Sequence, residues 1–200
     1  MSKLLNDPDV ALMVRFQQGD EDAFDALVEK FKKPVFNYIY WQIGAIDEAE
    51  DIAQNVFVQV YKSAKRYQPS AKFTTWLFTI ARNFCLNEFR RRRRHPLQSL
   101  QSLQETVSSE PGSDSSLWND PNIRSPAVEV LERELQEQVF AAIQRLPELQ
   151  RTAVLLCRYE GLSHEEISQI LHTSVSAIKS LLHRARKSLK VELNKYLRET

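Results

Sequence analysis

Cysteine, glycine and long apolar segments are all scarce in this 200-residue sequence. The two cysteines, Cys85 and Cys157, stand far apart in apolar surroundings, which excludes a disulfide framework and a zinc-binding pattern. We expect both to be free thiols in a reducing cytosol. No apolar run approaches the ~20 residues of a membrane-spanning helix, and the N-terminal stretch lacks the apolar core of a signal peptide. The sequence therefore predicts a cytoplasmic protein without membrane insertion.

Motifs of catalysis and metal binding are missing as well. The sequence contains no Gly-rich phosphate loop, no nucleophile elbow and no paired-carboxylate arrangement. His164, Glu165 and His172 do not have the spacing of a metal-binding HExxH motif, and we expect them to be solvent-exposed polar residues instead. We therefore expect no enzymatic activity, no cofactor and no metal.

The formal net charge of +1 hides an uneven distribution of charge along the chain. Residues 62–94 carry ten basic side chains and one acidic side chain, a net charge of +9. Residues 139–200 are net +4, whereas residues 1–61 and 95–138 are each net −6. Two basic blocks between acidic ones indicate two polyanion-binding surfaces on a chain that otherwise repels polyanions.

Aromatic residues are interleaved with the basic residues of 62–94. One interpretation is binding of nucleic acid with separated strands, since basic side chains attract phosphate and aromatic faces stack on unpaired bases. The other interpretation is an amphipathic helix whose aromatics lie in the core and whose run from Arg90 to Arg94 is a solvated end. Both interpretations remain open at this point.

Apolar periodicity predicts an all-α fold, because no run alternates like a half-buried strand. In the first part we expect a helical segment over 8–32 that breaks at Gly19, a helix from Pro34 to Gly44, a helix capped by Asp47, and a helix over 73–93. Residues 95–126 are rich in Ser, Pro, Asp and Gln and predict a flexible acidic linker.

A second helical part follows from about residue 127. A heptad-like apolar stripe leads to helices over 149–159, 163–171 and 175–197, and Ser163 with Glu166 forms the pattern of a capping box. The last two helices have a helix-turn-helix signature, in which the second helix enters the major groove. Its outer side offers eight small, polar or basic candidates: Ser174, Ser176, Ala177, Lys179, Ser180, His183, Arg184 and Arg186. A three-helix bundle with a basic surface helix is the alternative, and spacing, cap and charge favour DNA binding.

Three motifs in a fixed order resemble the bacterial extracytoplasmic-function (ECF) sigma factors of the sigma-70 family. They are DEAEDIAQNVFVQVYKSAKRY, FTTWLFTIARNFCLNEFRRRRR and LPELQRTAVLLCRYEGLSHEEISQILHTSVSAIKSLLHRARKSL. The resemblance implies two helical domains, a sigma-2 domain over 1–94 and a sigma-4 helix-turn-helix domain over 127–200, joined by the flexible linker 95–126. It implies promoter-specific transcription initiation, with a helix-turn-helix regulator that acts without core polymerase as the alternative.

The resemblance also implies partners and sites. The partners are core RNA polymerase (its β′ clamp coiled coil and β flap), promoter DNA and an anti-sigma factor. The core-binding residues would be Asp47, Glu50, Asp51 and Gln54. Without the resemblance, the acidic side chains of this helix would also be explained by a solvent-exposed face and by the helix dipole. The −10 strand would be taken by Tyr67, Gln68, Ser70, Lys72, Phe73, Arg82, Asn83, Arg90 and Arg91, and the −35 duplex by the eight candidates of the last helix.

Overall fold

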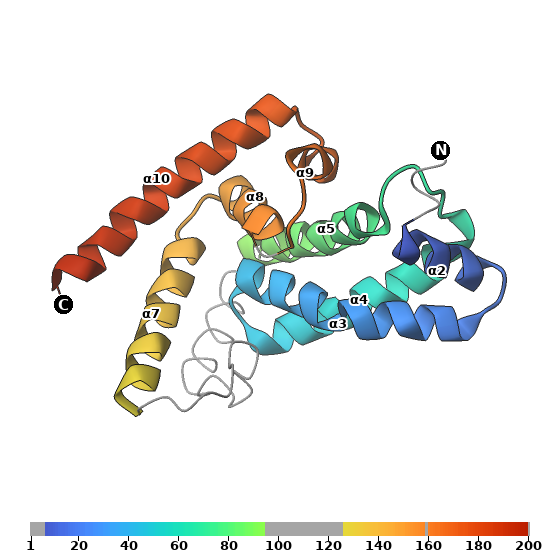
Figure 1. The fold of residues 1–200 in the computed structure, drawn as a ribbon, viewed down its shortest axis with the longest axis horizontal. Coiled ribbons are helices and arrows are strands. Elements are labelled where there is room, and N and C mark those ends of the chain that lie inside the picture. The colour runs from blue at the N-terminus through green and yellow to red at the C-terminus, as the bar shows by residue number, and fades with distance from the viewer. Residues whose placement is uncertain (1–6, 95–125, 159, 200) are drawn as a thin grey trace.

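The computed structural model describes residues 7–94, 126–158 and 160–199, and every regular element in these ranges is a helix (Figure 1). The first part contains α2 (Pro8–Gln17), α3 (Glu21–Ile43), α4 (Ile46–Ser63), the 3-10 turn η1 (Ala64–Arg66) and α5 (Phe73–Arg94). The second contains α7 (Pro126–Gln144), α8 (Glu148–Arg158), α9 (His164–Leu171) and α10 (Val175–Glu199). The predicted all-α fold is confirmed, and none of the described helices is both long and apolar enough to span a membrane. The predicted linker lies, apart from its last residue, outside the described residues.

The predicted helix start at Pro34 is wrong, because α3 continues through this proline. A proline inside a helix removes a hydrogen bond and costs about 3 kcal/mol. The buried stripe of α3 runs across the proline without interruption, with Phe31 and Val35 on either side of it. Tertiary packing of this stripe therefore outweighs the local penalty. The end of the helix is as predicted, since Gly44 adopts a left-handed conformation (φ 82°) after Ile43.

Asp47 does not cap α4, in contrast to the prediction. The N-cap is Ala45, which has no side chain that could accept a hydrogen bond, and Asp47 lies within the first turn together with Glu48. Their carboxylates stabilise the helix through its dipole instead. The shift by two residues lets Ala45, which is buried, pack into the core.

The helix-turn-helix prediction is confirmed in its local details. The Ser163 hydroxyl accepts a hydrogen bond from the Glu166 backbone, and the Glu166 side chain accepts one from the Ser163 backbone. His172 ends α9 in a left-handed conformation (φ 50°) and starts the turn into α10. The predicted stripe of α7 is only partly buried: Ile143 lies in the core, but Leu135 is 45% exposed.

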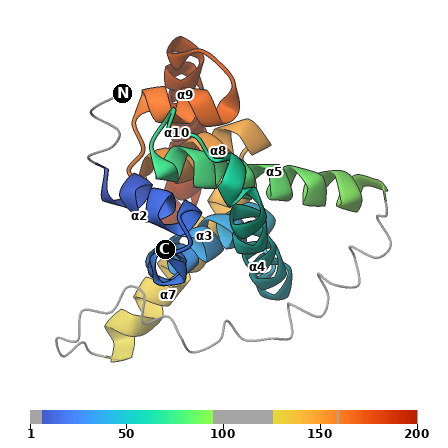
Figure 2. The same cartoon turned by 90° about the vertical axis from the view of Figure 1, so that its right-hand side faces the viewer.

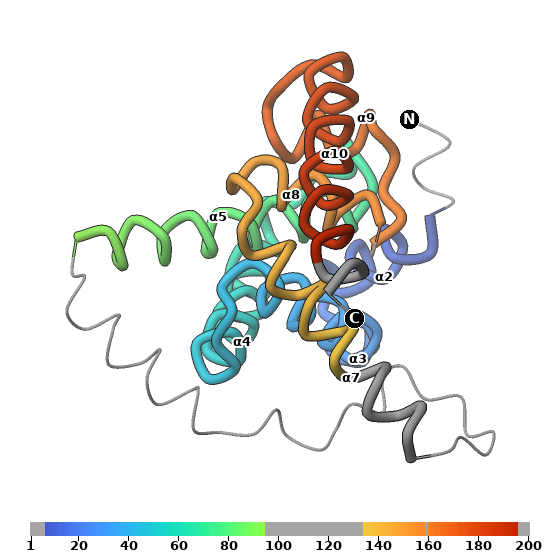
Figure 3. Tube along the Cα trace, turned by 90° about the vertical axis from the view of Figure 1, so that its left-hand side faces the viewer, coloured from blue at the N-terminus to red at the C-terminus, as the bar shows by residue number. Residues whose placement is uncertain are grey.

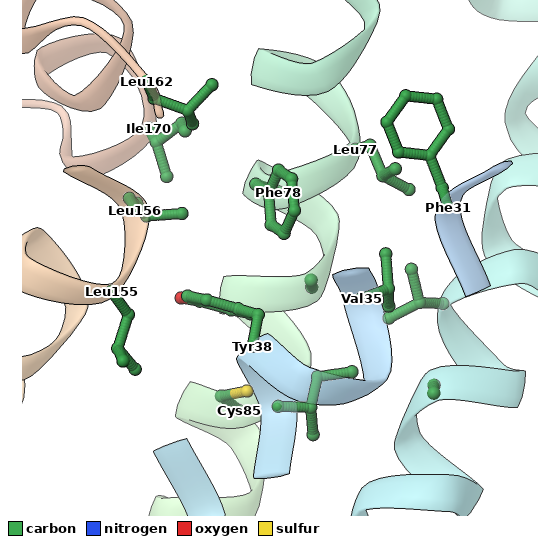
Figure 4. Close-up of a cluster of buried hydrophobic side chains, with 14 of the residues drawn as sticks. Phe31, Val35, Tyr38, Leu77, Phe78, Cys85, Leu155, Leu156, Leu162 and Ile170 are labelled. Carbon is green, nitrogen blue, oxygen red and sulfur yellow. The ribbon is translucent and has the colours of Figure 1, made fainter. Parts of the chain in front are cut away.

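The two parts of the chain pack against each other and share one hydrophobic core. Helices α8 and α9 lie along one side of α3 and α5, and α4 lies on the opposite side of this pair (Figures 1 and 2). The long α10 crosses α8 and reaches α7 (Figure 3). In the core, Tyr38 of α3 points between Leu155 and Leu156 of α8 (Figure 4). Contacts between segments about 100 residues apart in sequence therefore bring the two basic blocks onto one body.

Candidate nucleic-acid and polymerase interfaces

The segment between η1 and α5, residues 67–72, is held in place at its base. The Gln17 side-chain amide donates hydrogen bonds to the carbonyl oxygens of Ala64 (2.7 Å) and Tyr67 (2.9 Å). The Tyr67 ring is buried and packs on Trp76, with ring centroids 4.9 Å apart. Burial raises the pKa of Tyr67 to about 12. This anchoring fixes the backbone at the base of the loop, while the side chains of Gln68 and Ser70 stay exposed.

A cavity of about 360 Å³ opens beside this loop. Tyr67, Gln68, Ser70, Ala71, Thr75, Trp76 and Thr79 line it from the loop and α5, and Gln169 and His172 line it from the helix-turn-helix. Its volume is in the range of small-molecule binding pockets. The structure therefore brings three of the predicted −10 residues, Tyr67, Gln68 and Ser70, around one concave surface.

The other predicted −10 residues are distributed along α5. Phe73 is 1% exposed and packs in the core, so in this conformation it presents no face for stacking. Arg82 is half-buried and Asn83 is exposed. Arg90 and Arg91 are exposed near the end of the helix, where the Arg90 guanidinium bonds Asn87 (3.0 Å) and the Arg91 guanidinium bonds Glu88 (2.7 Å).

Most aromatics of the basic stretch belong to the core, as the second interpretation predicted. Phe78 is buried, and Trp76 and Phe84 are half-buried against the core cluster. Lys72 is exposed on the loop, 2.9 Å from a carboxylate oxygen of Glu166 on α9. This carboxylate raises the pKa of the Lys72 amine, first through the close polar contact and then through its charge.

The predicted −35 residues form a continuous surface on α10. Seven of them are exposed, namely Ser174, Ser176, Lys179, Ser180, His183, Arg184 and Arg186, and Ala177 is half-buried. The Ser174 hydroxyl accepts a hydrogen bond from the Ala177 backbone N–H (3.1 Å) and so caps the helix. Small residues at the N-terminal end and basic residues further along are the arrangement that major-groove recognition requires.

The predicted core-binding residues Asp47, Glu50, Asp51 and Gln54 are all exposed on α4. Sequence reasoning missed that an apolar pair extends this face, because Val58 is 48% and Tyr61 49% exposed. The spacing of three and four residues from Asp51 to Gln54 and from Gln54 to Val58 is the signal that could have placed Val58 on the same helix face. Exposed apolar side chains with polar side chains around them match a protein-docking surface, which has an apolar centre and a polar rim.

Sequence reasoning also missed the polar cluster at the C-terminal end of α3. Three side chains donate to the last carbonyl oxygens of this helix: Gln144 to Trp41 (2.7 Å), Arg151 to Gln42 (2.6 Å) and Arg92 to Ile43 (3.0 Å). Free carbonyls at a helix end need such partners when they are buried. Two of the three donors lie in the second part of the chain, so this cluster joins the two parts.

Among the described residues, no group of three or more His, Cys, Asp and Glu side chains could hold a metal ion. In the helix-turn-helix, Glu165 and His172 are exposed and His164 is half-buried.

Comparison with known proteins identifies two family regions in this chain. The family described as Sigma-70 region 2 matches residues 27–95, and the family described as Sigma-70, region 4 matches residues 136–189. The chain is 34% identical to the RNA polymerase sigma-H factor of Pseudomonas aeruginosa, over 98% of this chain and 99% of that protein. It is 31% identical to the ECF RNA polymerase sigma factor SigW of Bacillus subtilis, over 88% of this chain and 92% of the relative.

Solved structures with low sequence identity share the fold. The sigma factor RpoE of Bartonella quintana, solved in complex with the anti-sigma factor NepR, has a TM-score of 0.63 at 22% identity and covers 86% of this chain and 96% of its own. CnrH, solved in complex with the cytosolic domain of CnrY, has a TM-score of 0.66 at 22% identity, over 94% of this chain and 99% of its own. Because the Sigma-70 region 2 match lies in the first part of the chain, the alternative of a helix-turn-helix regulator that acts without core polymerase is not favoured. The chain belongs to the ECF sigma factors of the sigma-70 family.

Proposed function

We propose that this protein binds core RNA polymerase and directs it to promoters through two DNA contacts, one to the −35 duplex and one to a −10 strand. The observation that carries the proposal is that one chain has both an exposed recognition surface on α10 and an anchored loop, residues 67–72, which lines a cavity together with residues of α5 and of the helix-turn-helix. The first suits intact duplex, because a helix fits the major groove. The second suits an unstacked base, because a cavity can enclose it.

In this mechanism the loop captures a base that has left the stack. Unstacking and unpairing a base costs a few kcal/mol, which its capture must offset. Gln68 and Ser70 line the cavity with polar side chains that can bond a base edge, and Tyr67 supplies an apolar wall. The exposed Arg90 and Arg91 add a sequence-independent attraction for phosphate at the far end of α5.

Core polymerase would dock on α4. The exposed carboxylates of Asp47, Glu50 and Asp51 would face a basic partner surface, and Val58 and Tyr61 would lose apolar area to it. In this proposal the partner surfaces are the β′ clamp coiled coil for α4 and the β flap for the second part of the chain.

The remaining parts of the proposal concern chemistry, location and regulation. In this proposal the polymerase carries out all chemistry, and the chain contributes no active site of its own. The protein acts in the cytoplasm, because the polymerase works there. An anti-sigma factor is a further expected partner, and the solved complex of RpoE with NepR supports it by shared fold.

Run-off transcription tests the proposal. Purified chain and core polymerase are combined with genomic promoter fragments, and the reaction is repeated without the chain. We expect discrete transcripts only when both proteins are present. Intact binding to core without any promoter-specific transcript would contradict the proposed function.

A further inference from the structure

Gln17, the last residue of α2, bridges two carbonyl groups at the start of the loop that is proposed to capture the −10 strand. Its side-chain amide donates to the carbonyl oxygens of Ala64 (2.7 Å) and Tyr67 (2.9 Å), which lie 47 and 50 positions further along the chain. An amide nitrogen carries two N–H groups, so one side chain can serve both carbonyls. Helix α2 contacts both η1 and α5 (Figures 1 and 2). The bridge therefore spans η1 and fixes the point at which the chain leaves it.

The position of Gln17 is itself fixed by the end of α2. Phe16, next to it, is buried in the core. Gly19 adopts a left-handed conformation (φ 97°), and the Asp20 backbone N–H donates to the Arg15 carbonyl oxygen at 3.2 Å. The Arg15 guanidinium also lies 2.7 Å from the Asp20 carboxylate. These contacts hold the backbone around Gln17, so its amide reaches the loop from a rigid support.

The loop beyond the bridge has little conformational freedom. Tyr67 is extended (φ −62°, ψ 131°), and Gln68 precedes a proline, which disfavours helical backbone at Gln68. The Ser70 backbone N–H donates to the Gln68 carbonyl oxygen at 2.7 Å. The sequence of residues 67–72 contains no glycine. The direction of the loop therefore follows from its base, and a shift of the Tyr67 carbonyl moves Gln68 and Ser70 with it.

The packing of α2 is provided by other residues than Gln17. Val10, Met13 and Phe16 bury this helix against the core, at 0%, 0% and 8% exposure, whereas Gln17 is exposed. The two bonds of the Gln17 amide lie within the first part of the chain, so they do not depend on the second part. Loss of the amide should therefore free the base of the loop and leave the packing of the helices intact.

We propose that Gln17 is a positioning residue for strand capture: it holds the base of the loop so that Gln68 and Ser70 meet the captured base in a fixed direction. This inference rests on the proposed function of the loop. In this role Gln17 acts through the Tyr67 carbonyl rather than through contact with DNA. A strand that binds one loop conformation loses affinity in proportion to the fraction of molecules in other conformations. Because hydrogen bonds depend on direction, a fixed loop also discriminates better between base edges.

Two pairs of substitutions in the full chain test the inference. Gln17→Met keeps a side chain of similar length and removes both donors, and Gln17→Glu keeps the shape and turns a carboxylate toward the two carbonyl oxygens. Gln18→Met and Gln18→Glu make the same changes on an exposed neighbour. The members of each matched pair have equal net charge, so general electrostatics cannot separate them.

Each variant is assembled with core polymerase and mixed with a library of DNA single strands of random sequence, and the bound strands are sequenced. The enrichment of one base over the other three at each position measures recognition, and anisotropy with the enriched strand measures affinity. We expect both Gln17 variants to lose base enrichment and to bind the enriched strand roughly threefold to tenfold more weakly, the range that the loss of one or two such hydrogen bonds supports. Both Gln18 variants should match the parent chain, and core affinity should be unchanged in all four variants.

A weaker chain with unaltered base preference has lost stability rather than loop direction. The inference is therefore overturned if the Gln17 variants bind strands more weakly and enrich the same base as strongly as the parent chain does. It is also overturned if they match the parent chain in both measurements, or if the Gln18 variants show the same losses. A parent chain that enriches no base at any position would instead refute the proposed function of the loop, and with it this inference. The two failures are distinguishable, because one appears in the parent chain and the other only in the variants.

Discussion

Replacement of Arg151 by alanine is the perturbation whose effect the structure predicts most directly. The Arg151 guanidinium donates to the carbonyl oxygens of Gln42 (2.6 Å), Gln144 (2.7 Å) and Leu146 (3.2 Å), and to the Gln144 side-chain oxygen (2.7 Å). It therefore ties α8 both to α7 and to the end of α3. Burial lowers the pKa of this guanidinium, which indicates that its desolvation offsets part of the gain.

The magnitude follows from these bonds. A hydrogen bond from a charged group contributes about 1.5–3 kcal/mol, but water will enter the vacated site and the bonds do not add fully. We expect Arg151→Ala to lower the free energy of unfolding by about 2–4 kcal/mol. For a chain of this size the melting temperature should fall by about 4–16 °C. Arg151→Lys should recover less than half of this loss, because an ammonium lacks the planar fork of donors.

Thermal unfolding followed by far-ultraviolet circular dichroism measures the change. Arg145→Ala is the matched control, since Arg145 is exposed and forms one surface ion pair with Glu192 (3.0 Å). Such pairs contribute about 0–1 kcal/mol. An equal effect of Arg151→Ala and Arg145→Ala would refute the reasoning that a buried guanidinium joins the two parts.

Three further predictions concern the interfaces and pH. Burial raises the pKa of Glu160 to about 7 from an ordinary value of 4.5, so the folded state holds this proton more tightly and stability is lost as pH rises from about 4.5 to 7. Glu160→Gln should therefore increase the free energy of unfolding at pH 8 by up to about 3 kcal/mol and change it little at pH 4.5. The melting temperature, measured at both pH values, should rise only at pH 8. Lys179→Ala and Arg184→Ala should weaken holoenzyme binding to promoter duplex and each reduce the salt slope by about 1, measured by anisotropy titrations at several salt concentrations, and an unchanged slope would exclude phosphate contacts there. Asp51→Ala should weaken binding to core polymerase about twofold to tenfold in a pull-down titration without altering the melting temperature, and unchanged affinity would mean that the docking face lies elsewhere.

Local signals in the sequence predicted the elements whose ends depend on neighbouring residues. The capping box of Ser163 and Glu166, the helix end at Gly44 and the helix from Phe73 are all found in the structure. These features involve residues within a few positions of each other, so spacing alone encodes them. The uninterrupted α3 was missed because Pro34 is unfavourable locally, and only the buried stripe on both sides explains why the helix continues.

The contacts between the two parts of the chain could not be predicted in the same way. Gln42 and Thr152 are 110 positions apart, and neither lies in a pattern that indicates the other. The ion pair of Lys72 and Glu166 could not be predicted either, because the capping box explains Glu166 and the basic stretch explains Lys72 without a contact between them. Aromatic residues interleaved with charge were also ambiguous, because periodicity does not distinguish a ring such as Phe73 in the core from one that stacks on a base.

Run-off transcription with purified core polymerase tests the central claim most directly. The assay compares the parent chain, Asp51→Ala and Arg184→Ala on the same genomic promoter fragments. The account predicts promoter-specific transcripts with the parent chain and reduced yields with both variants, because Asp51→Ala weakens core binding and Arg184→Ala weakens duplex binding. A parent chain that binds core polymerase and yields no promoter-specific transcript would contradict it.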